Sequence, residues 1–160
     1  MLASSEIIVR QALTSDAAAL RAILYATYES TWLPNLTPAA AQVYFKEDRP
    51  AAYVAARGLR FLVAEHDKEL LAFVDWEGDF INALHVRPSY ARMGLGNRLM
   101  AVAETQILHA GFVAARLETD TFNTKSQAFY AARGYHEEDR YPDEEWNSGL
   151  TTILLVKPLN

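Results

Sequence analysis

The first third of the chain carries the pattern of a short strand followed by two amphipathic helices. A β-branched run over 7–10 predicts the strand. Polar residues at 14–16 can each cap a helix, and apolar residues then recur at helical spacing up to about Ser30. This pattern predicts a first helix. After a loop broken by proline, Thr37 is a good cap for a second helix over 37–47.

Three strands follow a short third helix. Pro50 interrupts the helical pattern, 51–57 resumes it, and Gly58 is typical of the left-handed residue just past a helix end. Apolar and β-branched runs separated by polar turns then predict an antiparallel meander. The strands expected in it cover 61–64, 70–76 and 80–86.

The second half of the chain alternates between helix and strand. An apolar helical face from Leu95 to about Ala110 ends at Gly111, and an alternating strand over 113–119 follows. Strand, loop, helix and strand make a βαβ unit, so the strands over 80–86 and 113–119 are expected to be parallel. A crevice is then expected where their carboxyl ends meet. The remaining expected elements are a helix over 124–133 and strands over 135–141 and 150–156.

The stretch 84–100 joins a strand end to a helix start through a loop with glycines at 94 and 96. Glycine permits positive φ and lets a ligand approach the backbone without meeting a Cβ. Free N–H groups at a helix start, with about half a positive charge from the helix dipole, attract anions. The loop therefore predicts an anion site. It is neither a dinucleotide fingerprint, which would need glycine at Leu99, nor a P-loop, which would need G-K-[ST].

Composition indicates an ordinary globular protein. The 160 residues are 51% hydrophobic and 22% charged, which allows a substantial core, and we expect a single domain over 1–160. No apolar run approaches the ~18 residues of a membrane span, and the N-terminus lacks the basic start and apolar core of a signal peptide. These features predict a cytoplasmic protein without a membrane partner.

Charge and the missing cysteines narrow the chemistry. A net charge of -5 and a pI near 5.3 argue against nucleic acid or anionic lipid as the partner and suit a cationic substrate. Because the chain has no cysteine, a covalent cysteine intermediate is excluded. A transferred group must then pass directly or through another nucleophile. The four histidines never share a helix face at ligand spacing, and we expect no metal site.

Two motifs stand in order along the second half. The pattern V-x-P-x-Y lies over 86–90 and is followed by the glycine loop over 91–96, while N-x-x-S-x-x-F-Y-x-x-x-G-Y lies over 123–135. Together they resemble the GNAT superfamily of N-acetyltransferases, which use acetyl-CoA to acylate amines. Ala91 stands where the family loop Q/R-x-x-G-x-G/A has Gln or Arg, and Ser126 replaces a small apolar residue.

The resemblance implies an α/β acyl-CoA N-acyltransferase fold. Its central sheet is mixed and mostly antiparallel, splayed between its two parallel middle strands and flanked by helices. The implied cosubstrate is acetyl-CoA (coenzyme A), with its pyrophosphate in the loop and its pantetheine arm along the preceding strand. Asn123 can cap its helix, which is the commonest role of Asn at such a position, and the resemblance also implies that it lies near the pantetheine arm; the two roles can coexist. The implied binding residues are Leu84, Val86, Arg92, Met93, Gly94, Leu95, Gly96, Asn97, Asn123 and Tyr130.

Tyr130 and Leu84 are the implied catalytic positions. A leaving thiolate with a pKa of ~8.5 needs a proton, and a phenol with a pKa of ~10 is protonated at working pH. Tyr130 therefore suits the general acid that the resemblance implies, whereas without the motif it reads as an aromatic packing beside Phe129. The resemblance also implies that the Leu84 N–H polarises the thioester carbonyl.

The sequence leaves open which residue accepts the proton of the amine. An amine with a pKa of ~10.4 has to lose a proton before it attacks, and the family's usual acidic residue is absent from 80–86. Glu77 is the first choice, directly or through water, although the acidic run 75–79 is typical of a solvated turn. His85 and a water held by Asn82 are the alternatives.

We therefore expect an acyltransferase that moves the acetyl group of acetyl-CoA directly to a primary amine of a small molecule or peptide. The alternative is a catalytically silent acyl-CoA-binding sensor or interaction module. Trp32 and Tyr28 either wall the acceptor pocket or pack in the core. The motifs do not choose among acceptors, and the resemblance makes a homodimer one expected assembly.

Overall fold

The computed structural model describes residues 6–143 and 149–160, and the strands in this part of the chain form one sheet. They are β1 (Ile8–Gln11), β2 (Leu62–His66), β3 (Glu69–Glu77), β4 (Phe80–Val86), β5 (Ala114–Asp120), β6 (His136–Pro142) and β7 (Thr151–Pro158). The order is β1-β2-β3-β4-β5-β7-β6, and β4 with β5 is the parallel pair among antiparallel neighbours. The mixed, mostly antiparallel sheet expected from the sequence is confirmed.

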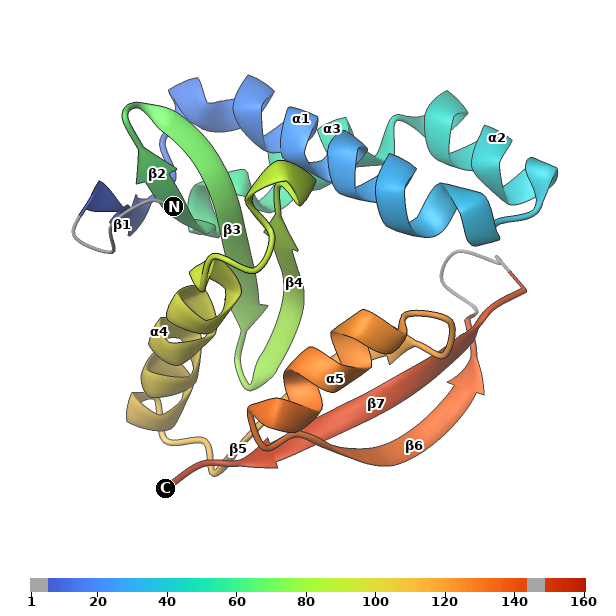
Figure 1. Cartoon of the computed structure of the whole chain (residues 1–160). Coiled ribbons are helices and arrows are strands. Elements are labelled where there is room, and N and C mark those ends of the chain that lie inside the picture. The colour runs from blue at the N-terminus through green and yellow to red at the C-terminus, as the bar shows by residue number, and fades with distance from the viewer. Residues whose placement is uncertain (1–5, 144–148) are drawn as a thin grey trace.

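Helices flank this sheet on both sides (Figure 1). On one side α1 (Ala17–Thr27) and α3 (Arg49–Arg57) pack on the β2–β4 half, and α2 (Pro38–Glu47) lies beyond the end of α1. On the other side α4 (Leu95–His109) packs on β2–β4, and α5 (Thr124–Ala132) lies over β5–β7. Within the described residues, no helix has the length and apolar character needed to cross a membrane.

Apolar helix faces hold the central strands from both sides. Leu20 and Ile23 of α1 pack in one buried cluster with Phe73 of β3, while Leu99 and Ile107 of α4 pack in a second. All five side chains are at most 1% exposed. Complete burial of such a side chain stabilises the fold by roughly 1.5–3 kcal/mol. The amphipathic pattern of the two helices therefore fixes the strands that carry the candidate site.

The sheet opens between its two parallel strands. The β4 and β5 ladder consists of two residue pairs, Phe80 with Arg116 and Ile81 with Leu117. From there to Val86, β4 has no partner on the β5 side, whereas β5 pairs with β7 as far as Asp120. The two strands thus diverge toward their carboxyl ends, which leaves the crevice expected from the sequence.

Two helix ends differ from the sequence prediction. The first helix ends as an α-helix at Thr27 and continues as a π-helical turn over Tyr28–Trp32, a geometry that local propensity does not signal. Gly58 is right-handed, with φ of −52°, instead of the expected left-handed residue. Its lack of a side chain serves packing, because a Cβ there would lie 3.1 Å from Cγ1 of Val54.

Candidate functional site

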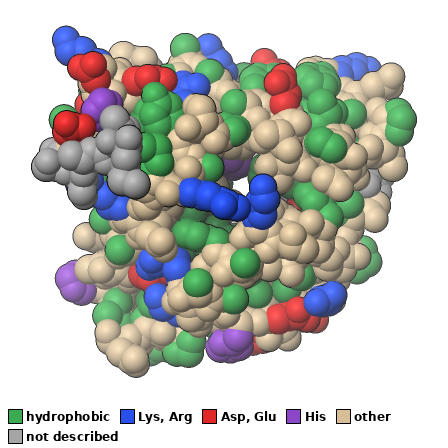
Figure 2. Space-filling model, in the orientation of Figure 1, with side chains coloured by type: hydrophobic (Ala, Val, Ile, Leu, Met, Phe, Trp, Pro, Cys, Tyr) green, Lys and Arg blue, Asp and Glu red, His purple; other side chains and the backbone are tan. Residues whose placement is uncertain are grey.

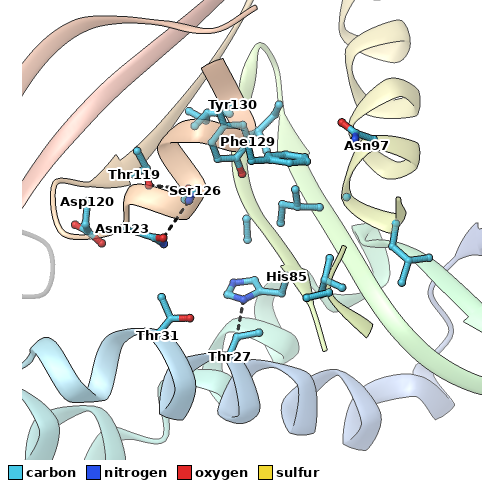
Figure 3. Close-up of a pocket in the computed structure, with 18 of the residues that line it drawn as sticks. Thr27, Thr31, His85, Asn97, Thr119, Asp120, Asn123, Ser126, Phe129 and Tyr130 are labelled. Carbon is cyan, nitrogen blue, oxygen red and sulfur yellow. Dashed lines mark hydrogen bonds between the residues drawn. The ribbon is translucent and has the colours of Figure 1, made fainter. Parts of the chain in front are cut away.

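A cavity of about 650 Å³ lies in the opening between β4 and β5. Figure 3 shows its walls: β4 and α5 face each other across it, with the start of α4 at one end and α1 at the other. On the face drawn in Figure 2, Lys or Arg side chains lie beside a hollow near the centre of the molecule. We call this space the first cavity.

The start of α4 forms one end of the first cavity. Gly94 precedes the helix with φ of 81°, and Arg92 also has a positive φ, of 65°. The helix receives no side-chain cap, and its first backbone bond runs from the Arg98 N–H to the Gly94 carbonyl at 3.0 Å. Backbone N–H groups of the first turn therefore have no helical acceptor and can bind an anion.

Gly96 serves close packing rather than a left-handed turn. It lies inside α4, where a Cβ would stand 3.1 Å from Cζ of Phe129 and 3.6 Å from Cδ2 of Leu84. This position corrects the expectation that both loop glycines supply positive φ. The small residue lets α4, α5 and β4 meet at the cavity floor.

Replacing Gly96 by alanine is expected to weaken binding of acetyl-CoA, the cosubstrate that the two motifs imply, about 3- to 10-fold. The added methyl group must displace the Phe129 ring, and overpacking of this kind costs about 1 kcal/mol or more. Gly111→Ala is the control, because φ of 101° strains that variant while nothing lies within 4 Å of its Cβ. Calorimetric titration checks both, and equal affinity losses in the two variants would contradict the packing role.

The backbone of β4 offers unpaired groups to the cavity. The Arg87 N–H donates to the Leu71 carbonyl of β3 at 2.8 Å. The backbone N–H and C=O groups of odd-numbered residues in this stretch therefore point toward β3. Backbone direction alternates along an antiparallel strand. The N–H and C=O groups of Leu84 and Val86 therefore point away from β3, into the opening where β5 has diverged.

A bulge next to this stretch redirects Asn82. Asp75 pairs with Ala83 and Trp76 pairs with Ile81, which leaves Asn82 as the extra residue on β4. Bulges of this type re-aim a side chain and occur frequently next to active sites. Here the Asn82 Nδ2 donates to Oδ2 of Asp75 at 3.1 Å, and the residue lines the first cavity.

Tyr130 lies on α5 with its side chain in the wall of the first cavity (Figure 3). It is 8% exposed, and its ring packs edge-on against Phe129 and Tyr135. Burial raises the pKa of its phenol above the ordinary value of 10. The group therefore stays protonated through the neutral range and is placed to donate a proton inside the cavity.

Asn123 begins α5 as its cap. Its Oδ1 accepts a hydrogen bond from the Ser126 N–H at 3.1 Å, which confirms the helix-cap reading of this residue. The Ser126 hydroxyl lies 2.9 Å from that of Thr119 on β5. Serine at this motif position therefore ties α5 to the strand beneath it, and all three residues line the first cavity.

The acidic run before β4 is divided among three environments. Asp75 is fully buried and binds Arg57 through both oxygens at 2.8 and 2.9 Å, with the Tyr53 hydroxyl at 2.7 Å. Glu77 accepts from Arg57 Nη1 at 2.8 Å, and its side chain is 66% exposed. Asp79 pairs with Arg116. The reading of this run as one solvated turn is therefore wrong, because β3 extends through Glu77 and buries Asp75.

His85 is held as a neutral imidazole. Its Nδ1 lies 2.8 Å from the Thr27 hydroxyl, and its ring packs against Trp32 and Phe73. Burial lowers the pKa of His85 to about 4. At neutral pH it has little tendency to bind a proton, which weakens the alternative that it takes the proton of an amine.

The lowered pKa of His85 makes stability depend on pH. Below about pH 6.5 the His85 imidazole of the unfolded chain binds a proton, whereas that of the folded chain stays neutral down to about pH 4. The free energy of unfolding therefore falls as pH drops through this window. The loss is expected to be on the order of 2–3 kcal/mol. Urea unfolding at pH 7 and pH 4.5 measures it, with His85→Gln as the control that should show a smaller pH effect. Equal losses in both proteins would contradict it.

Asp120 is the residue that sequence reasoning missed. It ends β5, and its Oδ2 accepts a hydrogen bond from the Trp32 indole N–H at 3.0 Å. Burial raises the pKa of Asp120 above 3.8, with help from the negative charges of Asp143 and Glu118. Its place in the sequence could have indicated it, because an acidic residue ends a strand that the chain order predicts to be parallel to its neighbour.

A second cavity, of about 660 Å³, adjoins the first on the side of α1 and α2. The two share one wall, which includes Asp120, His85, Asn82 and Trp32. Glu77 and Tyr28 line the second cavity and not the first. Tyr130 and Asp120 thus both line the first cavity, and Asp120 also lines the second.

Comparison with known proteins decides the family. The sequence profile of the acetyltransferase (GNAT) family matches residues 18–135. The chain belongs to this family. The superfamily resemblance based on the two motifs is thereby confirmed. The GNAT-family relative YhfO of Bacillus subtilis, an uncharacterized N-acetyltransferase, is 28% identical over 140 residues, which are 81% of this chain and 90% of that protein.

Solved structures share the GNAT fold. A GCN5-related N-acetyltransferase from Rhodopseudomonas palustris superposes with a TM-score of 0.81 at 22% identity, over 99% of each chain. The PaiA N-acetyltransferase from Thermoplasma acidophilum, solved in complex with coenzyme A, gives 0.74 at 19% identity, over 95% of this chain and 98% of that one. The acyl-CoA N-acyltransferase fold expected from the sequence is confirmed.

The geometry of this GNAT domain brings together most of the predicted binding residues. Met93 lies in the loop without lining the first cavity, and Glu77 lies outside it. Trp32 and Tyr28 both line the second cavity, and Tyr28 is also buried against Tyr44. The predicted residues that do line the first cavity are Leu84, Val86, Arg92, Gly94, Leu95, Gly96, Asn97, Asn123 and Tyr130.

Proposed function

We propose that this protein transfers the acetyl group of acetyl-CoA directly to a primary amine. The observation that carries the proposal is one cavity that runs from the uncapped start of α4, past the unpaired edge of β4, to the buried phenol of Tyr130. Membership of the GNAT family supports it, and so does the coenzyme A complex of the Thermoplasma relative.

The donor fits this cavity by its chemistry. The N–H groups of 92–97 suit the pyrophosphate, since those at the start of α4 receive no side-chain cap and have no helical acceptor. The outward backbone groups of Leu84 and Val86 suit the amide groups of the pantetheine arm, which would add to β4 like a further strand. Asn123 lies beside this path while it caps α5. The Leu84 N–H is then the donor that polarises the thioester carbonyl.

Tyr130 supplies the proton that the leaving sulfur needs. The amine nitrogen forms a bond to the carbonyl carbon, the carbon–sulfur bond breaks, and the thiolate takes the phenolic proton of Tyr130. The ammonium ion has given one proton to a carboxylate beforehand. The nitrogen loses its second proton after the attack, and this proton restores the phenol.

Two carboxylates are candidates to accept the first proton. Glu77 is the candidate from the sequence, and it lines the second cavity while bound to Arg57. Asp120 is the candidate favoured by position, because it lies on the wall that the two cavities share. Its environment also moves its pKa upward, in the direction that a proton acceptor at neutral pH requires.

Calorimetry with acetyl-CoA and an amine panel read by free-thiol release together test the proposal. We expect saturable binding of acetyl-CoA and thiol release that depends on the amine. Binding without turnover across the panel would favour the silent acyl-CoA-binding module instead. Absence of binding at near-millimolar acetyl-CoA would overturn both readings.

A further inference from the structure

The second cavity has an aromatic wall on the side of α1 and α2. Tyr28 and Tyr44 stack with ring centroids 3.5 Å apart and planes 1° apart, and both line the cavity. Trp32, Tyr53 and Phe80 add further rings to the lining. Such a wall gains most from an apolar, planar group, through buried area and ring–ring contact.

The charges on the lining favour one cation near Asp120. The Asp120 carboxylate receives a neutral donor, the Trp32 indole, and no Lys or Arg of the described chain lies within ion-pair distance of it. A half-buried carboxylate without a cationic partner is costly in the empty site and gains from a bound ammonium. Asp120 therefore marks the end of the cavity where the amine belongs.

The cationic side chains of the lining occupy the part that the first cavity does not share. They are Arg49 and Arg57. Arg57 is bound to Asp75 and Glu77, and Arg49 donates to Glu47 at 3.1 Å. The lining also holds the carboxylates of Glu77, Glu118 and Asp143, so its charge suits a cationic ligand and does not by itself separate a monoamine from a polyamine.

The Tyr28 side chain of this wall carries a buried hydroxyl. This side chain is 3% exposed, and its oxygen has no hydrogen-bond partner among the described residues. Burial raises the pKa of Tyr28 above the ordinary value, so the group is a neutral donor and acceptor. Unsatisfied buried hydroxyls are uncommon because they cost about 1–3 kcal/mol.

We propose that the second cavity binds a primary amine carried on an aromatic ring, with its ammonium at Asp120 and its ring against Tyr28, Tyr44 and Trp32. This inference rests on the proposed acetyl transfer and names its acceptor class. A carboxylate next to the amine, as in an amino acid, would stand beside Asp120 and Glu118 and is disfavoured by like-charge repulsion.

Acceptors that differ by one feature test the proposal. Phenethylamine, butylamine, phenylalanine and spermidine are compared by thiol release with saturating acetyl-CoA. We expect kcat/KM for phenethylamine to exceed that for butylamine by about tenfold or more, from burial of the ring. We expect a similar margin over phenylalanine and spermidine. Equal or higher values for any of these three acceptors would overturn the acceptor class.

A pair of matched variants tests the aromatic wall. Tyr44→Leu removes the stacking partner of Tyr28 and is expected to lower kcat/KM for phenethylamine about tenfold, mainly through KM, with little change for butylamine. Phe45→Leu is the control, because Phe45 packs edge-on against the same two rings but is 48% exposed and does not line the cavity. Equal effects of both variants, or an equal loss for butylamine, would contradict ring binding.

Binding without turnover separates this inference from the proposed reaction. The indole N–H resonance of Trp32, assigned by its loss in Trp32→Phe, reports on Asp120 directly because the two groups are hydrogen-bonded. Phenethylamine is expected to shift it, and phenylalanine is not. A shift without acetyl transfer would support the proposed amine site and contradict the proposed reaction. Acetyl transfer to other amines without a shift would contradict the amine site and support the reaction.

Discussion

Tyr130→Phe is expected to lower kcat about 10²-fold or more while acetyl-CoA affinity stays within about twofold. A positioned general acid contributes typically 10²–10⁴-fold, and the variant removes one oxygen from the cavity wall without changing the ring. Steady-state thiol release gives kcat, and calorimetry gives the affinity. The split between the two quantities distinguishes an acid from a packing residue.

Tyr135→Phe is the control for that experiment. Tyr135 packs against Tyr130, but its hydroxyl donates to Glu104 at 2.9 Å and does not line the cavity. Its loss should cost about 1 kcal/mol of stability and leave kcat nearly unchanged. Unchanged turnover in Tyr130→Phe, or equal losses in both variants, would remove the acid assignment.

The pH profile carries a second signature of the acid. Burial raises the pKa of the Tyr130 phenol above 10, so the proton is retained through the alkaline part of an ordinary assay range. We therefore expect kcat to show no decline from deprotonation of Tyr130 below about pH 10. A decline centred near pH 8 that vanishes in Tyr130→Phe would contradict this environment.

Local sequence pattern was sufficient where one face of an element is apolar. Phe80–Val86 has the predicted limits, and α4 ends one residue before the predicted range of 95–110. The spacing of apolar residues fixes the face that each element buries, and Gly111, with φ of 101°, ends the helix as expected. The parallel pairing of β4 with β5 also followed from the chain order.

Features that depend on distant partners were not predictable in this way. The Trp32 indole reaches Asp120 across 88 positions of sequence, and nothing in the pattern around Asp120 announces that contact. Asp75 looked like part of a polar turn because its partner Arg57 lies 18 positions earlier on a different element. Gly96 carries the same ambiguity, since its constraint is the Phe129 ring of another helix.

These misses concentrate at the acceptor side of the site. The side proposed for the donor is built mainly from backbone groups of one contiguous stretch, 84–97, so its motif could be recognised from order and spacing. The side proposed for the acceptor is assembled from α1, α2, α3, β4 and β5, with the π-helical turn after α1, and these elements lie far apart in the sequence. Function on that side is therefore a property of packing, which is where variants are most informative.

Asp120→Asn is expected to lower kcat/KM for the amine about 10²-fold or more, with acetyl-CoA affinity unchanged. The amide keeps an oxygen for the Trp32 indole but can neither take a proton nor hold an ammonium by charge. Glu77→Gln should cost less than about threefold, since that carboxylate is 66% exposed and engaged by Arg57. The reverse ranking would restore Glu77 as the proton acceptor.

A stability measurement distinguishes a catalytic role for Asp120 from a purely structural one. Because burial raises the pKa of Asp120, the folded state binds its proton more readily than the unfolded state, and folding stability from this group falls as pH rises above 3.8. Asp120→Asn removes that penalty, so the variant should unfold at equal or higher urea concentration at pH 7 while its turnover collapses. A variant that lost activity and stability together would show Asp120 to be a packing residue instead of the group that receives the amine.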